Sequence, residues 1–272
     1  MLIHALAAVT SVCLVGPPGD PGLTITWQTN DAEPVTLEPA GVFNPNFGWW
    51  TYGGFATDLS TGVTINYNLN ADVAVEEVGQ FATAVGTLIS GNVTIENPFL
   101  PTVVQRVTIT VPSAEMLTGA VAAASVVVGL TTDQDGGSIK ALPDGAVWTG
   151  LVDGGGAFVA FPYPFFMLYC GAIRCPNYTL PFPEPAPPVT ASVGIKLEFE
   201  LTQLDQASIT SVFIVATLLG DLDGDRTVGI VDFLALLAAW GTCSDCGKCP
   251  ADLDGDCSVG NLDLLILLGN WV

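Results

Sequence analysis

A loop of twelve positions, with acidic residues at fixed places, occurs twice near the C-terminus of this chain. The copies span Asp221 to Asp232 and Asp252 to Asp263, so the second follows the first by 31 residues (252 − 221). Trp240 and Trp271 keep the same offset beyond the loops. Because the match continues past the acidic positions, it indicates an internal duplication and not two chance acidic runs.

The spacing of these carboxylates suits a hard cation. They stand at positions 1, 3, 5 and 12 of each loop, so that one short segment can surround an ion with oxygen atoms. A backbone carbonyl would coordinate from position 7, and glycine at position 9 leaves room for a water. Asp-Gly-Asp runs are also typical of solvated turns, but the duplication favours two calcium ions. The predicted ligands are Asp221, Asp223, Asp225, Thr227 and Asp232 in the first loop, and Asp252, Asp254, Asp256, Ser258 and Asp263 in the second.

After each loop comes an apolar stretch, at 231–240 and 262–271, whose leucines recur at helical spacing. A loop followed by a helix, with aspartate at position 12 and no helix before the first loop, resembles the type I dockerin repeat over residues 220–272. The resemblance implies a calcium-binding module that docks onto a cohesin-like protein. Position 6 is usually glycine because the chain turns sharply there. We expect Arg226 and Cys257, which hold it here, to strain the turn or weaken the sites.

The two copies differ in polarity directly after the ninth position. Ile230 and Val231 follow it in the first copy, whereas Asn261 and Leu262 follow it in the second. Two equivalent docking faces are therefore not expected. The module could instead dock onto the β domain of its own chain and serve stability.

The cysteines favour disulfides over a metal site. Apart from Cys13 there are six, an even number that fits pairing in an oxidising compartment. Four of them fall in and beside the second loop, where they could also bind zinc, but calcium binding and an export signal favour two disulfides. The remaining two cysteines are expected to close a further small loop by a disulfide. The four are Cys243, Cys246, Cys249 and Cys257, and the pair is Cys170 and Cys175.

The charge balance excludes some partners and fits a secreted protein. Lys and Arg number 6 against 27 Asp and Glu, for a net charge of −21, which repels nucleic acid and anionic membranes. Residues 1–15 are apolar and resemble the core of an export signal without its usual basic start, or alternatively form a first strand. The apolar run at 116–130 is too short for an integral membrane span.

The body of the chain predicts an antiparallel β-sandwich. Alternating apolar and polar residues form short runs bounded by Gly, Pro, Asn and Asp, and no long amphipathic helix lies between them. We therefore expect a sandwich at 16–218 and the acidic module at 219–272. The prolines of 176–188 exclude a central strand and predict an extended surface loop. Strands are expected at 23–27, 63–69, 88–95, 106–111, 125–130, 157–161, 193–201 and 208–216.

The sequence contains little that could catalyse a reaction. His4 is the one histidine, and it stands in the possible export signal, so a hydrolase would need a pair of carboxylates. Solvated strand or turn positions account for each candidate pair. An aromatic group beside two glycines could stack on a sugar ring, although burial in the core is the simpler interpretation. The pairs are Glu76–Glu77, Asp133–Asp135 and Glu198–Glu200, and the aromatic residues are Trp49, Trp50 and Tyr52.

Together these features predict a secreted, extracellular or cell-surface protein with no catalytic residue. A β-sandwich would be carried on a calcium-dependent attachment module, whose partner is a cohesin-like protein or the chain's own sandwich. Two alternatives remain open. One is an extracellular polysaccharide-binding or polysaccharide-degrading component, which as an enzyme would be a carboxylate-based glycoside hydrolase. The other is a structural subunit of a surface fibre, in which strands are exchanged during self-assembly.

Overall fold

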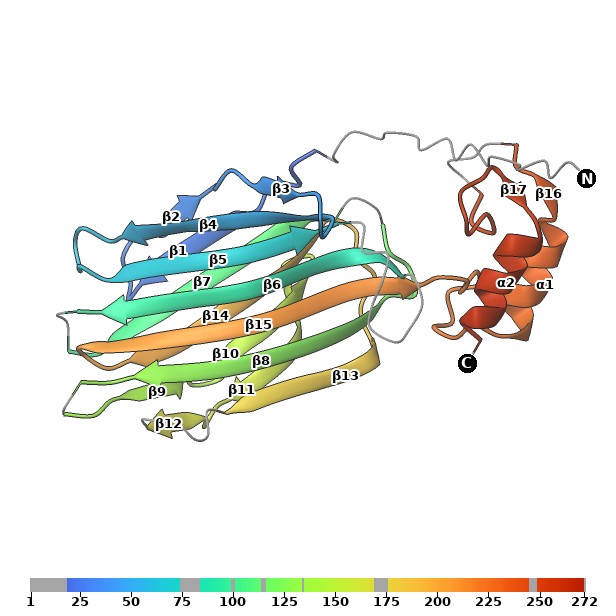
Figure 1. Ribbon diagram of the computed structural model, residues 1–272. Helices are drawn as coiled ribbons and strands as arrows, with labels where there is room; N and C mark the ends of the chain where they lie inside the picture. The colour runs from blue at the N-terminus through green and yellow to red at the C-terminus, as the bar shows by residue number, and fades with distance from the viewer. Residues whose placement is uncertain are drawn as a thin grey trace, which may run out of the picture.

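The protein is mainly β, and its described residues form two large antiparallel sheets, one small two-stranded sheet and two short helices (Figure 1). The structure is a computed structural model. The predicted mainly β fold is confirmed, and the two sheets face each other as in a β-sandwich, while the helices lie beyond one end of the sheets. The residues described by the structure are 19–73, 84–98, 101–113, 116–133, 135–168, 176–244 and 249–271.

The first sheet contains eight strands. Six follow one another across it, while β9 pairs with β14 and β12 pairs with β9. In spatial order the six are β11 (Gly155–Pro162), β10 (Ala146–Val152), β14 (Ser192–Leu201), β7 (Val103–Pro112), β1 (Thr24–Thr29) and β2 (Val35–Leu37), and the two others are β9 (Ser138–Ala141) and β12 (Phe166–Leu168).

The second sheet contains seven strands and faces the viewer in Figure 1. Strand β15 (Asp205–Leu218) pairs along most of its length with β6 on one side and β8 on the other, so its backbone is hydrogen-bonded on both edges. In spatial order the strands are β13 (Asn177–Pro185), β8 (Val121–Thr131), β15 (Asp205–Leu218), β6 (Ala84–Asn97), β5 (Thr64–Asp72), β4 (Trp49–Thr57) and β3 (Val42–Asn44).

Alternation along the strands creates one core between the sheets. In β7, for example, every second residue from Val103 to Val111 is buried, which is the period of a strand with one buried face. Large side chains from both sheets meet there, including Trp27, Trp148 and Phe213. Each of the eight strands predicted from the sequence overlaps a strand of the structure.

The proline-rich segment is not the surface loop that its composition predicts. It forms β13, which pairs with β8 at the edge of the second sheet. The pairing passes from Leu180↔Ala124 to Glu184↔Ala122, so the chain bulges out of register at 181–183. Proline cannot donate a ladder hydrogen bond, but an edge strand with a bulge needs fewer donors. The exclusion of a central strand was therefore correct, and the expectation of a loop was wrong.

The C-terminal part follows β15 after a short connection. Helix α1 (Ile230–Ala238) and helix α2 (Asn261–Gly269) are separated by two short paired strands, β16 (Gly241–Thr242) and β17 (Ser258–Val259). A small separate cluster lies between the helices and loops. Its buried apolar residues are Val228, Leu236, Ala251, Val259 and Leu267.

This module touches the sandwich through its first acidic loop. The backbone at Gly119 approaches Gly224 so closely that a Cβ on Gly119 would lie 2.9 Å from the Gly224 carbonyl oxygen. The Arg226 guanidinium lies 3.5 Å from the carbonyl oxygen of Ala186. Among the described residues, neither helix is long and apolar enough to cross a bilayer.

Candidate metal centre

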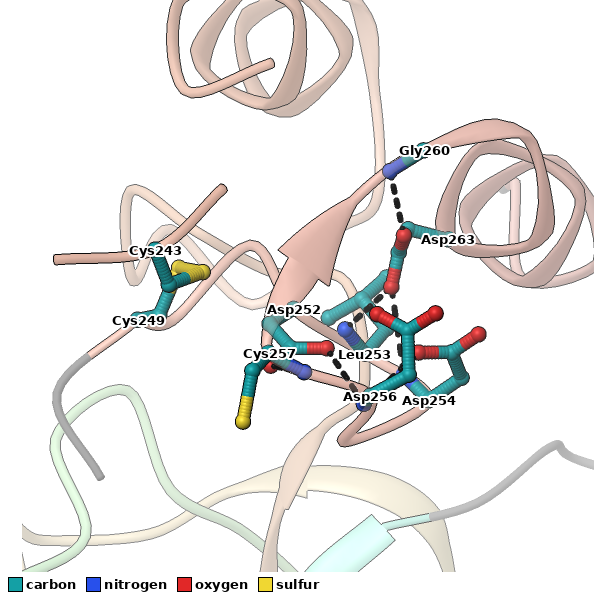
Figure 2. Close-up of a disulfide and its surroundings, with 9 residues drawn as sticks. All are labelled: Cys243, Cys249, Asp252, Leu253, Asp254, Asp256, Cys257, Gly260 and Asp263. Carbon is teal, nitrogen blue, oxygen red and sulfur yellow. Dashed lines mark hydrogen bonds between the residues drawn. A yellow bond between two sulfur atoms is a disulfide. The ribbon is translucent and has the colours of Figure 1, made fainter. Parts of the chain in front are cut away.

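Each predicted calcium loop brings three carboxylates together. One carboxylate oxygen from each of Asp221, Asp223 and Asp225 falls within 4.8 Å of the others. Asp252, Asp254 and Asp256 form the matching cluster in the second loop (Figure 2). In the part of the chain that the structure describes, these are the two groups of this kind. The loop positions 1, 3 and 5 thus converge as the spacing predicts.

The carboxylate at position 1 folds the loop around itself. Asp221 Oδ1 accepts hydrogen bonds from the amides of Gly224 (2.8 Å) and Asp225 (3.1 Å), and its Oδ2 accepts one from Arg226 (2.9 Å). In the second loop the equivalent acceptor, Asp252, takes hydrogen bonds from Asp256 (3.1 Å) and Cys257 (2.9 Å). The backbone amides of each loop therefore hold the position 1 carboxylate, Asp221 or Asp252, in place.

Position 6 has the strained backbone that the sequence predicts. Arg226 has φ 74° and Cys257 has φ 71°, both in the left-handed region. A side chain there costs about 1–2 kcal/mol relative to the right-handed region, and glycine avoids that cost. The turn needs this conformation, because it points the amide of position 6 at the carboxylate of position 1. Both loops therefore adopt the expected turn in spite of their residues.

The carboxylates at position 12 lie outside the two clusters and close the loops instead. Asp232 is 1% exposed, and its Oδ1 accepts from the amides of Leu222 (2.7 Å) and Asp223 (3.2 Å). Its Oδ2 accepts from the amide of Gly229 (2.7 Å), which caps the start of α1. Asp263 repeats this arrangement at α2. Position 12 thus fixes loop to helix, where its negative charge also favours the helix N-terminus.

The residues at position 7 differ between the loops. The amide and hydroxyl of Thr227 both donate to Asp225 Oδ1, at 2.8 and 2.6 Å. Ser258 instead begins β17 and pairs with Thr242 of β16. The small sheet therefore ties the second loop to the segment after α1, a constraint that the loop spacing alone did not predict.

One carboxyl group in each acidic loop has a raised pKa, while the hydrogen bonds from Thr227 lower the pKa of Asp225. Burial raises the pKa of Asp221, and the nearby charges of Asp232 and Asp225 add to this effect. In the second loop, burial and the charges of Asp263, Asp256 and Asp252 raise the pKa of Asp254. Carboxylates forced together repel one another, and a bound cation would relieve that repulsion.

The cysteines beside the second loop form disulfides. Cys243 bonds to Cys249 (Figure 2). Cys257 is disulfide-bonded as well. The amide of Cys243 also donates to the carbonyl of Cys257 at 3.0 Å. Oxidised sulfurs do not ligate zinc, so the disulfide interpretation is favoured over a four-thiol site. Cys246 and the predicted pair Cys170–Cys175 lie outside the described residues.

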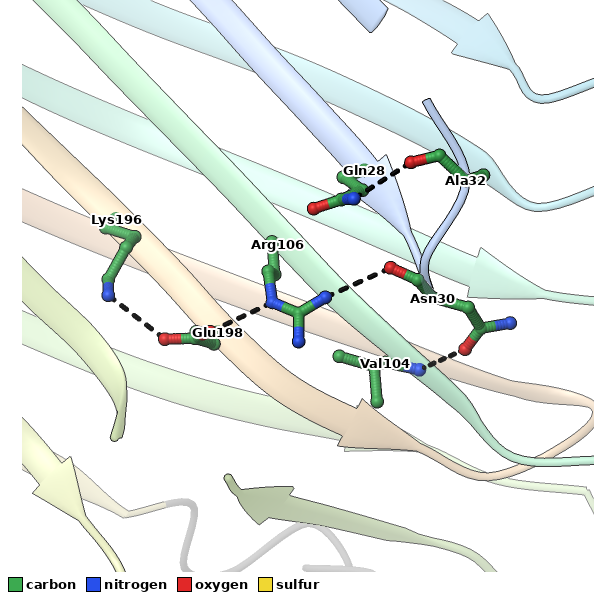
Figure 3. A network of polar contacts seen from close by, with 7 residues as sticks. All are labelled: Gln28, Asn30, Ala32, Val104, Arg106, Lys196 and Glu198. Atoms are coloured by element: carbon green, nitrogen blue, oxygen red, sulfur yellow. Dashed lines mark hydrogen bonds and ion pairs between the residues drawn. The ribbon is translucent and has the colours of Figure 1, made fainter. Parts of the chain in front are cut away.

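The paired glutamates of β14 form ion pairs on the outer face of the first sheet, and Figure 3 shows those of Glu198. Glu198 accepts from Arg106 Nε and Lys196 Nζ, both at 3.0 Å, and Glu200 lies 3.6 Å from Lys140. Burial would raise the pKa of Glu198, but the two cations outweigh it and lower the pKa below its usual value. Such a carboxylate stays ionised and is unsuited to act as a general acid.

Among the described residues, carboxylates also lie at the Asp133–Asp135 turn and in a pocket beside β10. The amide of Asp135 donates to Asp133 Oδ1 at 2.8 Å, as in a polar turn. A shallow pocket beside β10 is lined by Asp144, Tyr163 and Lys196, and no second acid lines it. The pair at 76–77 lies outside the described residues.

The predicted aromatic group divides between the two faces of β4. Tyr52 is buried and Trp50 is half-buried against the core, as the burial interpretation expects. Trp49 points to the other face and stacks on Phe47, with ring centroids 4.8 Å apart and planes 11° apart. Phe55 is exposed on that same face. Sequence reasoning missed Phe47 and Phe55, whose position depends on strand alternation and on the preceding turn.

Comparison with known proteins adds no family to this description. No protein-family model matches the sequence, and no curated protein matches it.

Proposed function

We propose that this chain is a secreted, non-catalytic protein that carries a β-sandwich on a calcium-dependent, dockerin-like attachment module. The observation that supports the proposal best is the structural repetition of the acidic module. Each copy has a three-carboxylate cluster, a buried acid at position 12 and a following helix at the same offset. Disulfides beside the second loop fit an oxidising, extracellular location.

Calcium suits the donor set of the two loops. The converging atoms are carboxylate oxygens, which hard cations prefer, and the backbone amides that hold position 1 keep the ligands in place. Asp221, Asp223 and Asp225 would hold one ion, and Asp252, Asp254 and Asp256 the other. Asp232 and Asp263 stand beside the clusters as further ligands or as acceptors that orient the loop. The bound ion would neutralise the charge repulsion in each loop.

Both helices present a stripe of exposed large apolar side chains. The stripe of α1 contains Val231, Leu234 and Leu237 and continues to Trp240, all of them exposed. Adding the duplication offset of 31 to these positions gives the second stripe, in which Leu265 reaches 64% exposure. Contiguous exposed apolar surface of this kind marks a site of protein contact. The members of the second stripe are Leu262, Leu265, Leu268 and Trp271.

These stripes favour an external partner over the chain's own sandwich. Their side chains stay exposed although the module lies next to the sheets, and the contacts with the sandwich come from the first loop. The stripes match in side-chain type apart from Val231 against Leu262, while directly before them Ile230 in one copy replaces Asn261 in the other. We therefore propose a cohesin-like protein partner, which either stripe could engage.

Calcium titration of the full, oxidised chain by calorimetry tests the first half of the proposal. Two bound ions are expected, together with a higher melting temperature in calcium than in chelator, because an ion that binds the native state alone stabilises it. Absence of binding at millimolar calcium would refute the proposal.

Docking is tested by surface plasmon resonance against a panel of cohesin modules. Leu234→Glu and Leu265→Glu each place a charge in one stripe and leave the calcium ligands intact. If the stripes are equivalent, either single variant still binds and the double variant does not. A double variant that binds as well as the parent would show that the stripes are not the docking surface.

A further inference from the structure

The outer face of the second sheet is uncharged over three rows of residues that run across five strands, and we call these rows the neutral face. The registers of β4, β5, β6, β15 and β8 place the rows side by side. No ionisable side chain stands in them, although the chain has a net charge of −21. The rows are Phe55–Asn66–Thr94–Ser208–Gly129, Gly53–Asn68–Asn92–Thr210–Val127 and Thr51–Asn70–Ser90–Val212–Ser125.

The outer face of the first sheet is different. It carries the ion pairs of Arg106, Lys196 and Glu198 (Figure 3). It also carries the pair Lys140–Glu200. Charged side chains would keep either outer face in contact with water equally well. Hydroxyl and amide side chains occur on both outer faces, so what sets the neutral face apart is the lack of charged side chains in its three rows, and this calls for a separate explanation in terms of a ligand.

Hydrogen bonds hold part of the neutral face in a fixed arrangement. Asn92 Nδ2 donates to Ser208 Oγ (2.9 Å) and Thr210 Oγ1 (3.0 Å), and Asn92 Oδ1 accepts from Thr94 Oγ1 (2.8 Å). Thr51 Oγ1 donates to Asn70 Oδ1 at 3.0 Å. These side chains form an ordered polar floor across β4, β5, β6 and β15.

Other amides on the same face are open to a ligand. The side chains of Asn66 and Asn68 are exposed, and no hydrogen bond among the described residues engages their amide groups. Each amide offers two donors and one acceptor oxygen. Gly53, which pairs with Asn68, leaves open space, since a Cβ there would meet only the Tyr67 carbonyl oxygen at 4.0 Å.

Aromatic rings flank this open space along β4. Phe55 is 75% exposed and lies beside Asn66. Trp49 lies on the same side of the sheet, one row beyond the neutral face and six residues from Phe55, about 20 Å at the rise of a strand, and it stacks on the exposed Phe47. The strand thus presents an aromatic ring, an open glycine with free amides beside it, and a second aromatic pair.

We propose that the neutral face binds a neutral polysaccharide. The sugar rings stack on Phe55 and on the Trp49–Phe47 pair, because aromatic rings offer an apolar surface to the C–H face of a sugar. The sugar hydroxyls exchange hydrogen bonds with Asn66 and Asn68. An anionic polymer would lack a cation to pair with on this face, and a chain with this net charge would repel it.

The test is retention of the full chain by polysaccharides in affinity gels and pull-downs. The probes are microcrystalline cellulose, xylan, mannan and starch, with polygalacturonate as the charged comparison. Retention by at least one neutral polymer is expected, with little dependence on salt. Phe55→Ala and Trp49→Ala are each expected to weaken it about tenfold, the equivalent of about 1.4 kcal/mol.

Phe166→Ala is the matched control, since this ring is also exposed (50%) but lies on β12 of the first sheet. It should bind as the parent does. Retention should persist in chelator, so the result is independent of the proposed calcium sites. The proposal is overturned if no neutral polymer retains the chain, if polygalacturonate alone does, or if both aromatic variants bind like the parent.

Discussion

The β-sandwich and the C-terminal module are stabilised by different means. The sandwich buries a large apolar cluster from both sheets, including Trp27, Trp148 and Phe213, and each large apolar side chain contributes about 1.5–3 kcal/mol. The module has a cluster of five buried apolar residues among the described ones. A core of that size does not normally hold a fold on its own.

Hydrogen bonds and disulfides stabilise the module in place of a large apolar core. Buried Asp232 and Asp263 each satisfy three backbone amides at the junction of loop and helix. The Cys243–Cys249 disulfide and the disulfide of Cys257 add covalent constraints. Chelator and reductant should therefore destabilise the module, whereas loss of core volume should destabilise the sandwich.

Loss of a large core side chain should have the largest effect, and it should fall on the sandwich alone. Phe213 is fully buried and packs against Trp148 and Phe158, with centroids 5.5 and 5.9 Å away. We expect Phe213→Ala to lower the free energy of unfolding by about 3–5 kcal/mol, because it leaves a cavity. Guanidinium unfolding measures this change. Unaltered calcium binding in the folded variant would confirm that the two regions are independent, and a loss below about 1 kcal/mol would contradict the described core.

Removal of a position 12 carboxylate should affect the module by a smaller amount. We expect Asp232→Ala to destabilise the module by about 1–3 kcal/mol even in chelator, since it leaves three backbone amides without their acceptor. It should also remove one calcium ion, as measured by calorimetry. Asp263→Ala, the equivalent change in the other loop, is the matched comparison. If each variant retained two ions, position 12 would act only as a helix cap.

Loss of the Cys243–Cys249 disulfide should have the next largest effect on stability. The double variant Cys243→Ser, Cys249→Ser removes a bond that closes a short loop, with a sequence separation of 6. The chain-entropy estimate for such a loop is about 2 kcal/mol. Melting followed separately for the module and the sandwich should show a shift in the module only. A shift of the sandwich transition would mean that the two regions unfold as one unit.

The repetition in the sequence predicted how the acidic residues of the module cluster, because residues within one short loop are brought together by local spacing. Asp221, Asp223 and Asp225 converge within a single turn, so no long-range contact is needed to bring them together. The hydrogen-bonding role of Asp232 was not predicted. It depends on where α1 begins, and the boundary of a helix is not fixed by periodicity.

The strands were predictable for a similar reason, while their pairing was not. Alternation identifies a strand and its buried face, but it does not specify the neighbouring strand. The edge position of β13 therefore could not be predicted from the sequence. The neutral face could not be predicted either, because it forms only when strand pairing places Asn66, Thr94 and Ser208 in one row. Trp49 was singled out as a ring beside two glycines, but its partner Phe47 required the turn geometry.

Low pH should destabilise the sandwich at Asp153, a carboxylate whose hydrogen bonds link two of its loops. Asp153 accepts hydrogen bonds from the amides of Thr190, Ala191 and Ser192 and from the Thr190 hydroxyl. Burial would raise its pKa, but these donors outweigh it and lower the pKa to about 2. Because the folded pKa lies below the unfolded value, the stabilisation is full above the unfolded pKa and is lost as pH falls through about 2.

The variant Asp153→Ala isolates this contribution. Its melting temperature should be lower than that of the parent near pH 6, by an amount equivalent to about 1 kcal/mol. The difference between the two proteins should shrink steadily between pH 4 and pH 2. A difference that stayed constant over this range would show that the ionised carboxylate is not the stabilising group.

Relief of backbone strain in the first loop should give the smallest effect and the opposite sign. Arg226 has φ 74° and its side chain is exposed. We expect Arg226→Gly to stabilise the module by about 0.5–1 kcal/mol, since glycine adopts this conformation without the steric cost, and to tighten calcium binding at that loop. Gly224→Ala is the matched control: its φ is 78° and space for a Cβ is open, so it adds the same kind of strain without a clash. It should destabilise the module by a similar amount. If both variants shifted stability in the same direction, strain at position 6 would not limit the first site, and the lost contact of Arg226 with the Ala186 carbonyl would become the better explanation.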